Sequence, residues 1–305
     1  MKSYLKIAFV PSTFLPTIGG SETQIHNFAN KITELDNVVD IFLLNKAKIK
    51  NRKYSIIKLN KIFINFIYLL KYYLNIDLTF LLKIYFGKIC KKKKYDVWHF
   101  QSVNYKTLLY LKPLKMLGEK TYISFHGADI QKDEVINYGY RFDKKYETLL
   151  AKSLKYVDKV FVISDDVERE LKTFSFPGDK IVKIPCTIDL NKIKSFKINR
   201  IKDDKLRIIT ATRFQKKKKG LDFIEKIAKS LIEKKYNFKW TLVGRNSDQL
   251  LNISFIKKNL PFEKSDIIKT EASTKWCSEI LKYKPKVKPR EGIKYFLEWY
   301  KKYYL

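Results

Sequence analysis

The chain has 305 residues, of which 45% are hydrophobic and 15% aromatic, so it holds enough apolar material for packed cores and is not a disordered polymer. Its 63 lysines and arginines exceed its 31 acidic residues, giving a formal net charge of +32, which favours anionic lipid, nucleic acid or phosphorylated substrates as partners. A genome-wide bias toward Lys, Ile, Asn, Phe and Tyr explains this excess equally well. The length predicts two domains.

The cysteines and the apolar stretches indicate which kinds of protein this chain is not expected to be. Cys90, Cys186 and Cys277 are odd in number and far apart, which argues against a disulfide framework or a zinc site and favours a reducing cytoplasm. The longest mainly apolar stretch, Ile62–Leu70, is much shorter than the roughly 20 residues that span a bilayer. We therefore expect a cytoplasmic protein without a transmembrane helix.

The N-terminal segment predicts a strand followed by a helix. Leu5–Val10 is mainly apolar and is typical of a buried strand. Ser21, followed three residues later by Gln24, has the form of a capping box, so we expect the helix to start at Ser21. Apolar residues then follow at helical spacing, at Ile25, Phe28, Ala29, Ile32 and Leu35.

The rest of the chain continues to alternate strands and helices, which predicts parallel crossovers and doubly wound, Rossmann-like sheets. We expect an N-terminal domain over residues 1–186, a linker over 187–204 and a second domain over 205–262. Only two strands are predicted after the linker, so we expect this second domain to be incomplete. The further predicted strands are Val38–Leu44, Tyr95–Phe100, Thr121–Phe125, Lys159–Ile163, Ile181–Ile184, Leu206–Thr212 and Phe238–Val243, and a helix is predicted over Leu221–Lys235.

Two glycines, Gly19 and Gly20, lie between the first strand and the first helix. Glycines there let a ligand approach the backbone, and the helix N-terminus favours an anion, although a tight turn alone would also explain them. The whole segment Ile7–Glu22 resembles the opening of the family 4 retaining glycosyltransferases. The resemblance, which extends over about residues 5–260, implies a GT-B-like fold of two Rossmann-like domains facing each other across a cleft.

Two later segments resemble cleft strands of the same family. One ends at His99 and has Gln101 where a second His is common, and the other is Ser124–Asp129. The resemblance implies that His126 is the catalytic residue beside the donor sugar, whereas a His at a strand end is more often a packing residue. It also implies an acceptor side of the cleft formed by Glu22, His99, Asp129 and Ser164.

The segment Thr210–Gly220 resembles the family's first strand and loop of the second domain, where one Arg and one Lys hold the donor's pyrophosphate. The resemblance gives these roles to Arg213 and Lys219, and a solvated basic loop is the alternative. Such fixed cations neutralise a departing diphosphate without a metal. No Asp-x-Asp pair occurs in the sequence, so we expect neither a metal nor a cofactor. The implied donor-binding set is Gly19, Gly20, Arg213, Lys219 and Gly244.

The last part of the chain departs from this family. Glu271 and Glu279 have the spacing of its donor-sugar glutamates but lack the glycines of that turn, so we interpret the spacing as accidental. From about Thr270 the sequence instead resembles the C-terminal end of nucleotide-sugar epimerases of the extended short-chain dehydrogenase family. We therefore predict an epimerase-like helical tail over residues 263–305 in a composite chain.

The resemblance implies transfer of a sugar from a nucleotide-sugar donor to a polysaccharide, lipopolysaccharide or glycolipid acceptor with retention. An incomplete donor domain suggests an alternative, a catalytically deficient module that binds a membrane surface or an acceptor. Aromatic residues and lysines interleave over Ile62–Lys94, which is typical of peripheral binding to an anionic surface at the inner face of the plasma membrane, or of an ordinary core with solvated faces. No nucleic-acid motif accompanies the charge, so we expect no specific nucleic-acid partner.

Overall fold

A computed structural model describes residues 4–17, 19–45, 47, 49–186, 205–212 and 218–244. The chain divides into two compact units, Met1–Ile193 and Lys194–Leu305, and each is described by itself. The predicted linker, 187–204, and the predicted tail, 263–305, lie outside the described residues.

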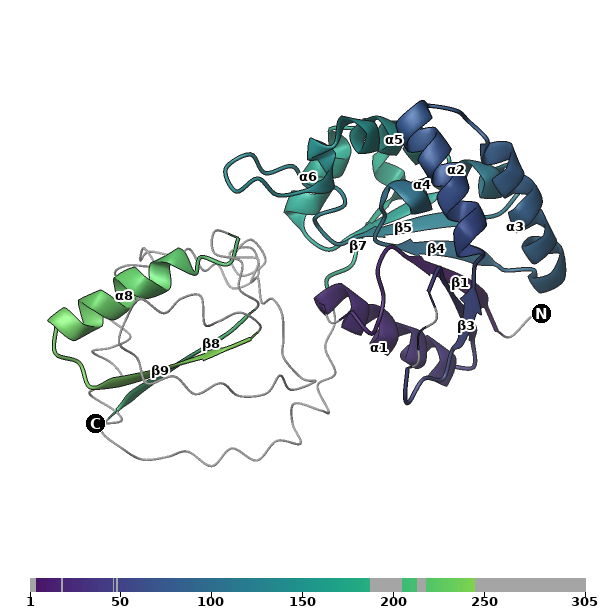
Figure 1. The fold of residues 1–305 in the computed structure, drawn as a ribbon. Helices are drawn as coiled ribbons and strands as arrows, with labels where there is room; N and C mark the ends of the chain where they lie inside the picture. Colours follow the sequence, from purple (N-terminus) through teal and green to yellow (C-terminus); the bar gives the residue numbers. More distant parts are fainter. Residues whose placement is uncertain are drawn as a thin grey trace. The chain divides into compact units, whose positions relative to one another are not determined.

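The first unit is built on a parallel sheet of seven strands in the order β3-β2-β1-β4-β5-β6-β7 (Figure 1), which confirms the doubly wound fold. The order reverses at β1, because the chain proceeds to β2 and β3 on one side and to β4 through β7 on the other. Ligands of such sheets bind at the carboxyl ends of the strands at this switch point. The strands are β1 (Lys6–Pro11), β2 (Val38–Leu43), β3 (Ser55–Lys58), β4 (Val97–Gln101), β5 (Thr121–Phe125), β6 (Lys159–Val162) and β7 (Ile181–Lys183).

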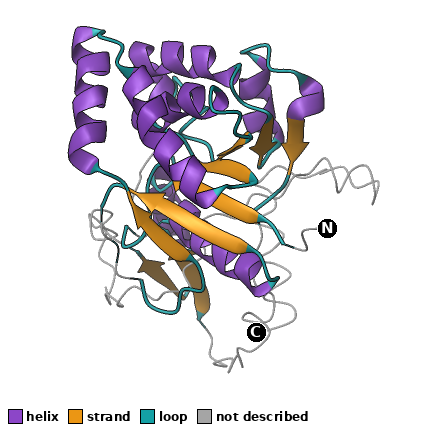
Figure 2. Ribbon diagram, turned by 90° about the vertical axis from the view of Figure 1, so that its right-hand side faces the viewer, coloured by secondary structure: helices purple, strands orange, loops and turns teal. Residues whose placement is uncertain are grey.

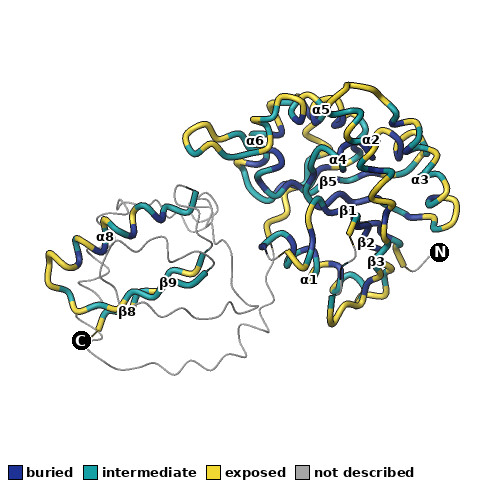
Figure 3. The backbone as a smooth tube through the Cα atoms, in the orientation of Figure 1, coloured by how far each residue is buried: buried dark blue, intermediate teal, exposed yellow. Residues whose placement is uncertain are grey.

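Helices cover both faces of this sheet (Figures 1 and 2). On one face, Trp98, Phe100 and Phe125 form a buried core with five helices. On the other face, Phe9 and Ile41 form a second core with a single helix, α1, and Figure 3 shows the strands as the most buried part of the unit. The helices are α1 (Gly20–Glu34), α2 (Lys61–Leu74), α3 (Thr79–Lys93), α4 (Tyr105–Lys115), α5 (Lys144–Leu154) and α6 (Asp165–Lys172), with short 3₁₀ helices η1 (Tyr140–Phe142) and η2 (Gly178–Lys180).

Helix α1 begins differently from the prediction. Its N-cap is Gly19, which makes no side-chain cap hydrogen bond, so the capping box at Ser21 was wrong. The reason is that the Ser21 hydroxyl donates to Oε2 of Glu22 at 3.0 Å instead of accepting from a backbone N–H. Strand β3 was not predicted, because its four residues contain only two apolar side chains, Ile56 and Ile57.

In the second unit the structure describes two parallel strands, β8 (Leu206–Ala211) and β9 (Phe238–Val243), joined through helix α8 (Asp222–Glu233). Helix α8 buries Ile224, Ala228 and Leu231 on one face. These elements agree with the sequence-based expectation for a second α/β unit. None of the described helices is both long and apolar enough to cross a bilayer.

Candidate functional site

The carboxyl ends of β1, β4 and β5 lie side by side at the switch point of the sheet, because these strands are parallel neighbours. Each is followed by a segment with polar side chains. Residues at the ends of these three strands and in the segments that follow them form the candidate site.

The segment after β1 places a buried carboxylate at the start of α1. Glu22 is only 6% exposed, and its Oε1 accepts a hydrogen bond of 2.5 Å from the Thr13 hydroxyl. The backbone of Gly19 is extended, which any residue could adopt, but a Cβ there would lie 2.2 Å from Oε2 of Glu22. Gly19 therefore makes room for this carboxylate.

Asp129 joins the loops that follow β4 and β5. Its Oδ1 accepts from the backbone amides of His126 at 3.0 Å and Gly127 at 2.9 Å, and its Oδ2 accepts from the amide of Val103 at 3.3 Å. Asp129 is 1% exposed, and this burial raises its pKa. Gly127 has a φ of +126°, a left-handed conformation that favours glycine. These contacts fix the position of His126.

His126 is half-buried and its Nε2 lies 3.4 Å from Oε1 of Gln101. Burial lowers the pKa of His126, while the negative charges of Asp129 and Glu22 act in the opposite direction. The imidazole is therefore mainly neutral at pH 7, so one ring nitrogen donates and the other accepts. Burial is the largest cause of the raised pKa of Tyr140, and the charges of Asp129 and Glu22 raise this pKa further. No sequence pattern indicated that Tyr140 belongs to the site.

His99 and Ser164, two further residues of the predicted acceptor side, contact neighbouring residues of the fold. Nε2 of His99 lies 2.8 Å from the Ser124 hydroxyl, and burial lowers the His99 pKa to about 3. Nε2 of Gln101 lies 3.4 Å from both ring nitrogens of His99. Gln101 therefore connects His99 to His126, and His99 itself lies farther from the strand ends. Ser164 is the N-cap of α6 and accepts from the amide of Val167 at 3.4 Å.

In the second unit, Lys219 lies in the turn before α8, and Gly244 follows β9 with a φ of +138°. The Thr212 amide donates to the Val243 carbonyl at 2.8 Å, so the ends of β8 and β9 share one edge. Arg213 lies outside the described residues. In the parts of the chain that the structure describes, no group of three or more His, Cys, Asp and Glu side chains is placed to hold a metal ion.

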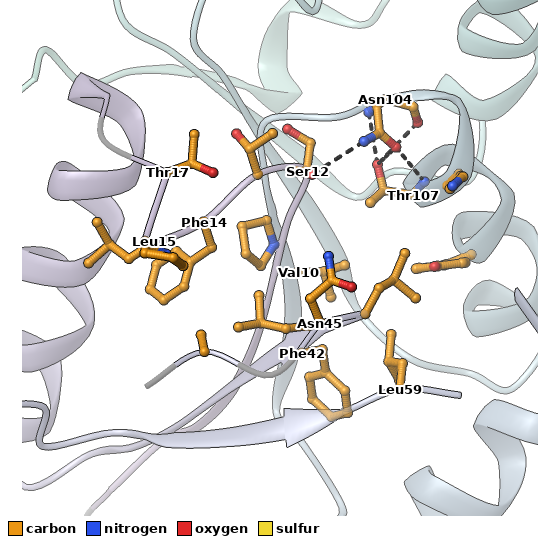
Figure 4. A pocket seen from close by; sticks show the side chains of 18 residues that line it. Val10, Ser12, Phe14, Leu15, Thr17, Phe42, Asn45, Leu59, Asn104 and Thr107 are labelled. Carbon is orange, nitrogen blue, oxygen red and sulfur yellow. Dashed lines mark hydrogen bonds between the residues drawn. The ribbon is translucent and has the colours of Figure 1, made fainter. Parts of the chain in front are cut away.

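A cavity of about 240 Å³ adjoins the switch point on the side of β2 (Figure 4). Tyr110 lines this cavity, but its hydroxyl is fully buried and has no hydrogen-bond partner among the described residues. Asn104, which forms a capping box with Thr107, also donates to the Ser12 carbonyl at 3.3 Å. The sequence did not predict this cavity, because its lining comes from segments far apart in the chain. Its polar lining includes Thr13, Asn45, Asn104, Lys106 and Thr107.

The sequence model of the family described as "Glycosyltransferase Family 4" matches residues 18–192, which is more than half of the chain. A search of curated proteins finds no significant match.

Solved glycosyltransferase structures share the fold. A glycosyltransferase from Rickettsia africae is 18% identical, with a TM-score of 0.57 over 86% of this chain and 69% of that chain. The Anabaena protein Alr3699/HepE in complex with UDP and glucose is 12% identical, with a TM-score of 0.57 over 85% of this chain and 70% of that chain. The same Anabaena protein in complex with UDP-glucose has a TM-score of 0.54 at 12% identity, over 85% of this chain and 69% of that chain.

Proposed function

The chain belongs to glycosyltransferase family 4, and from this premise we propose that it transfers a sugar from a nucleotide-sugar donor to a polysaccharide, lipopolysaccharide or glycolipid acceptor, with retention at the anomeric carbon. The complexes of the structurally similar Anabaena protein with UDP and UDP-glucose support a nucleotide-sugar donor. In this reaction a bond forms between an acceptor oxygen and the anomeric carbon. The bond from that carbon to the diphosphate oxygen breaks, and the proton of the acceptor hydroxyl passes to the departing diphosphate.

The observation that carries the proposal is the cluster at the switch point. Glu22 in the first turn of α1, Gln101 at the end of β4, and His126 and Asp129 after β5 are far apart in the sequence, yet contacts and charges connect them at one edge of the sheet. A sugar presents hydroxyl groups, which both donate and accept hydrogen bonds. A mainly neutral His126 together with a buried carboxylate offers both kinds of partner, so this edge suits a sugar ring.

We assign the leaving diphosphate to the second unit. Arg213 and Lys219 would neutralise the charge that develops on the diphosphate as it departs. Lys219 lies before the N-terminus of α8, where the helix dipole favours an anion as well. Gly19 and Gly20 would lie beneath the transferred sugar in the first unit, and Gly244 would leave room for the nucleotide at the end of β9.

The cavity beside β2 is the proposed site for the acceptor's reacting sugar. It adjoins the switch point, and its lining includes the hydroxyl of Thr13 and the side chain of Asn104. Hydroxyl and amide groups both donate and accept hydrogen bonds, as the hydroxyls of an acceptor sugar require. The amide of Asn45 and the ammonium group of Lys106 provide further hydrogen-bonding groups in the lining.

Calorimetry and a transfer assay test the proposal together. We expect the full chain to release heat with UDP or UDP-glucose, and Lys219→Ala to weaken that binding about tenfold. Lys229→Ala is the matched control, because Lys229 lies on the exposed side of α8 and pairs with Glu225. His126→Ala should retain donor binding but lower kcat about 100-fold. Absence of heat with every common nucleotide sugar would refute the enzyme and favour the acceptor-binding module.

A further inference from the structure

Helix α2 carries large apolar side chains on the face that points away from the core. Its buried face holds Ile64 and Ile67. On the opposite side, a second stripe recurs at spacings of four, three and four residues, so its members lie along one line of the helix. This stripe consists of Ile62, Phe66, Leu69 and Tyr73, which are between 49% and 84% exposed.

Helix α3 continues this pattern and adds charge. Phe80 and Ile84 are 59% and 58% exposed, and Lys88 follows at the same spacing of four residues. Lys91 and Lys92 extend the line into the last turn, and all three lysines are exposed. None of these three lysines forms an ion pair with a described residue. The two helices are exposed over much of their length (Figure 3).

The two stripes are joined by a connection of four residues, 75–78, beside which Leu74 is 63% exposed. Soluble proteins rarely leave so many large apolar side chains together in water unless a partner covers them. Helix α2 has only 14 residues, which is too short to span a bilayer but sufficient to lie in its interface.

We propose that the exposed stripes of α2 and α3, called here the α2–α3 surface, bind an anionic lipid bilayer. The apolar side chains would enter the boundary between headgroups and acyl chains, while Lys88, Lys91 and Lys92 would contact anionic headgroups. Charge complementarity selects this occupant. A second copy of a chain with a net charge of +32 would bring like charges together, whereas an anionic surface attracts them.

The position of this surface in the unit supports the same partner. Leu59, which lines the cavity beside β2, lies two residues before α2. The Lys106 ammonium group, also in the cavity lining, donates to Oδ1 of Asn65 on α2 at 2.8 Å. A bilayer bound at α2 therefore lies next to the cavity. The membrane surface does not depend on the proposed reaction, because binding to lipid needs neither donor nor transfer.

Sedimentation of the full chain with vesicles tests the inference. We expect binding to phosphatidylglycerol–phosphatidylcholine vesicles at low salt and at least tenfold weaker binding to pure phosphatidylcholine. Lys88→Gln/Lys91→Gln should lower the partition coefficient about 30-fold. Ile62→Glu/Phe66→Glu should abolish binding. All four side chains are exposed, so circular dichroism should show an unchanged fold.

Matched controls distinguish binding through this surface from nonspecific binding to vesicles. Val135 is 86% exposed on a different loop, and Lys152 is exposed on α5, so Val135→Glu and Lys152→Gln should bind vesicles like the unaltered chain. Equal loss in these controls, or unchanged binding in the α2–α3 variants, would overturn the proposal. So would concentration-dependent dimerisation in sedimentation velocity that Ile62→Glu/Phe66→Glu removes. Loss of vesicle binding with transfer to a soluble acceptor retained would support the surface and leave the reaction untouched.

Discussion

Replacing His99 should make the first unit more resistant to acid. His99 has an ordinary pKa of 6.5 when unfolded, and burial lowers it to about 3 in the native state. Between these values the unfolded chain binds a proton that the native chain does not. The free energy of unfolding therefore falls as pH drops below 6.5. At pH 5 the pKa of His99 in the unfolded chain lies 1.5 units above the pH. Protonation of the unfolded chain therefore lowers the free energy of unfolding by about 2 kcal/mol.

As long as the pKa of His99 in the native chain stays below about 4, this loss in the free energy of unfolding depends only on the pH and on the pKa of His99 in the unfolded chain. Gln is a suitable replacement, because its amide can still bond the Ser124 hydroxyl but does not titrate. Urea unfolding at pH 7.5 and pH 5 measures the effect. The unaltered chain should lose about 2 kcal/mol more than His99→Gln over this interval.

Ser124→Ala serves as the control, because it removes the hydrogen-bond partner and leaves His99 buried. Since burial is the first cause of the lowered pKa, this variant should keep the pH dependence of the unaltered chain. Equal pH dependence in the unaltered chain and His99→Gln would refute the reasoning, because it would mean that the buried ring takes up its proton near pH 6.5.

Three further substitutions test the site. Gly19→Ala should displace the Glu22 carboxylate and lower kcat about 100-fold, with little effect on the free energy of unfolding. Gly178→Ala is the control, because an added Cβ there meets nothing within 4 Å, and it should leave the transfer rate unchanged. Asp129→Asn points an amide group at backbone N–H donors and should lower the free energy of unfolding by about 3 kcal/mol in urea; no loss would contradict a structural role. Tyr110→Phe removes a buried hydroxyl without a described partner, so it should leave the free energy of unfolding in urea unchanged or raise it by about 1 kcal/mol, and a loss of stability would contradict this reading of the hydroxyl.

The fold of the first unit was largely predictable because a parallel sheet buries both faces of its strands. Ile7–Val10 and Thr121–Phe125 therefore appear as compact, mainly apolar runs, and the helices between them show helical spacing. The short edge strand β3 was missed because an edge strand with two apolar residues resembles a loop. The helix start at Ser21 was misjudged because the hydroxyl bonds to Glu22, a competing local partner that the sequence pattern does not reveal.

The candidate site was only partly predictable. His126 and Asp129 were selected through a family resemblance, and the structure shows the contacts that hold them. The hydrogen bond from Thr13 to Glu22 depends on how a loop folds back on a helix. The burial of the Tyr110 hydroxyl depends on which strands and helices surround it. Neither follows from spacing along the chain, since both arise from tertiary packing.

Gly19 shows how the structure changes the chemical argument. From the sequence, a glycine at a helix N-terminus favours a bound phosphate. In the structure, the Glu22 carboxylate occupies the space where a Cβ of Gly19 would lie. A phosphate at the same helix end would meet that negative charge and be repelled by it. The N-terminus of α1 is therefore better suited to neutral sugar hydroxyls, and the diphosphate is better placed beside the cations of the second unit.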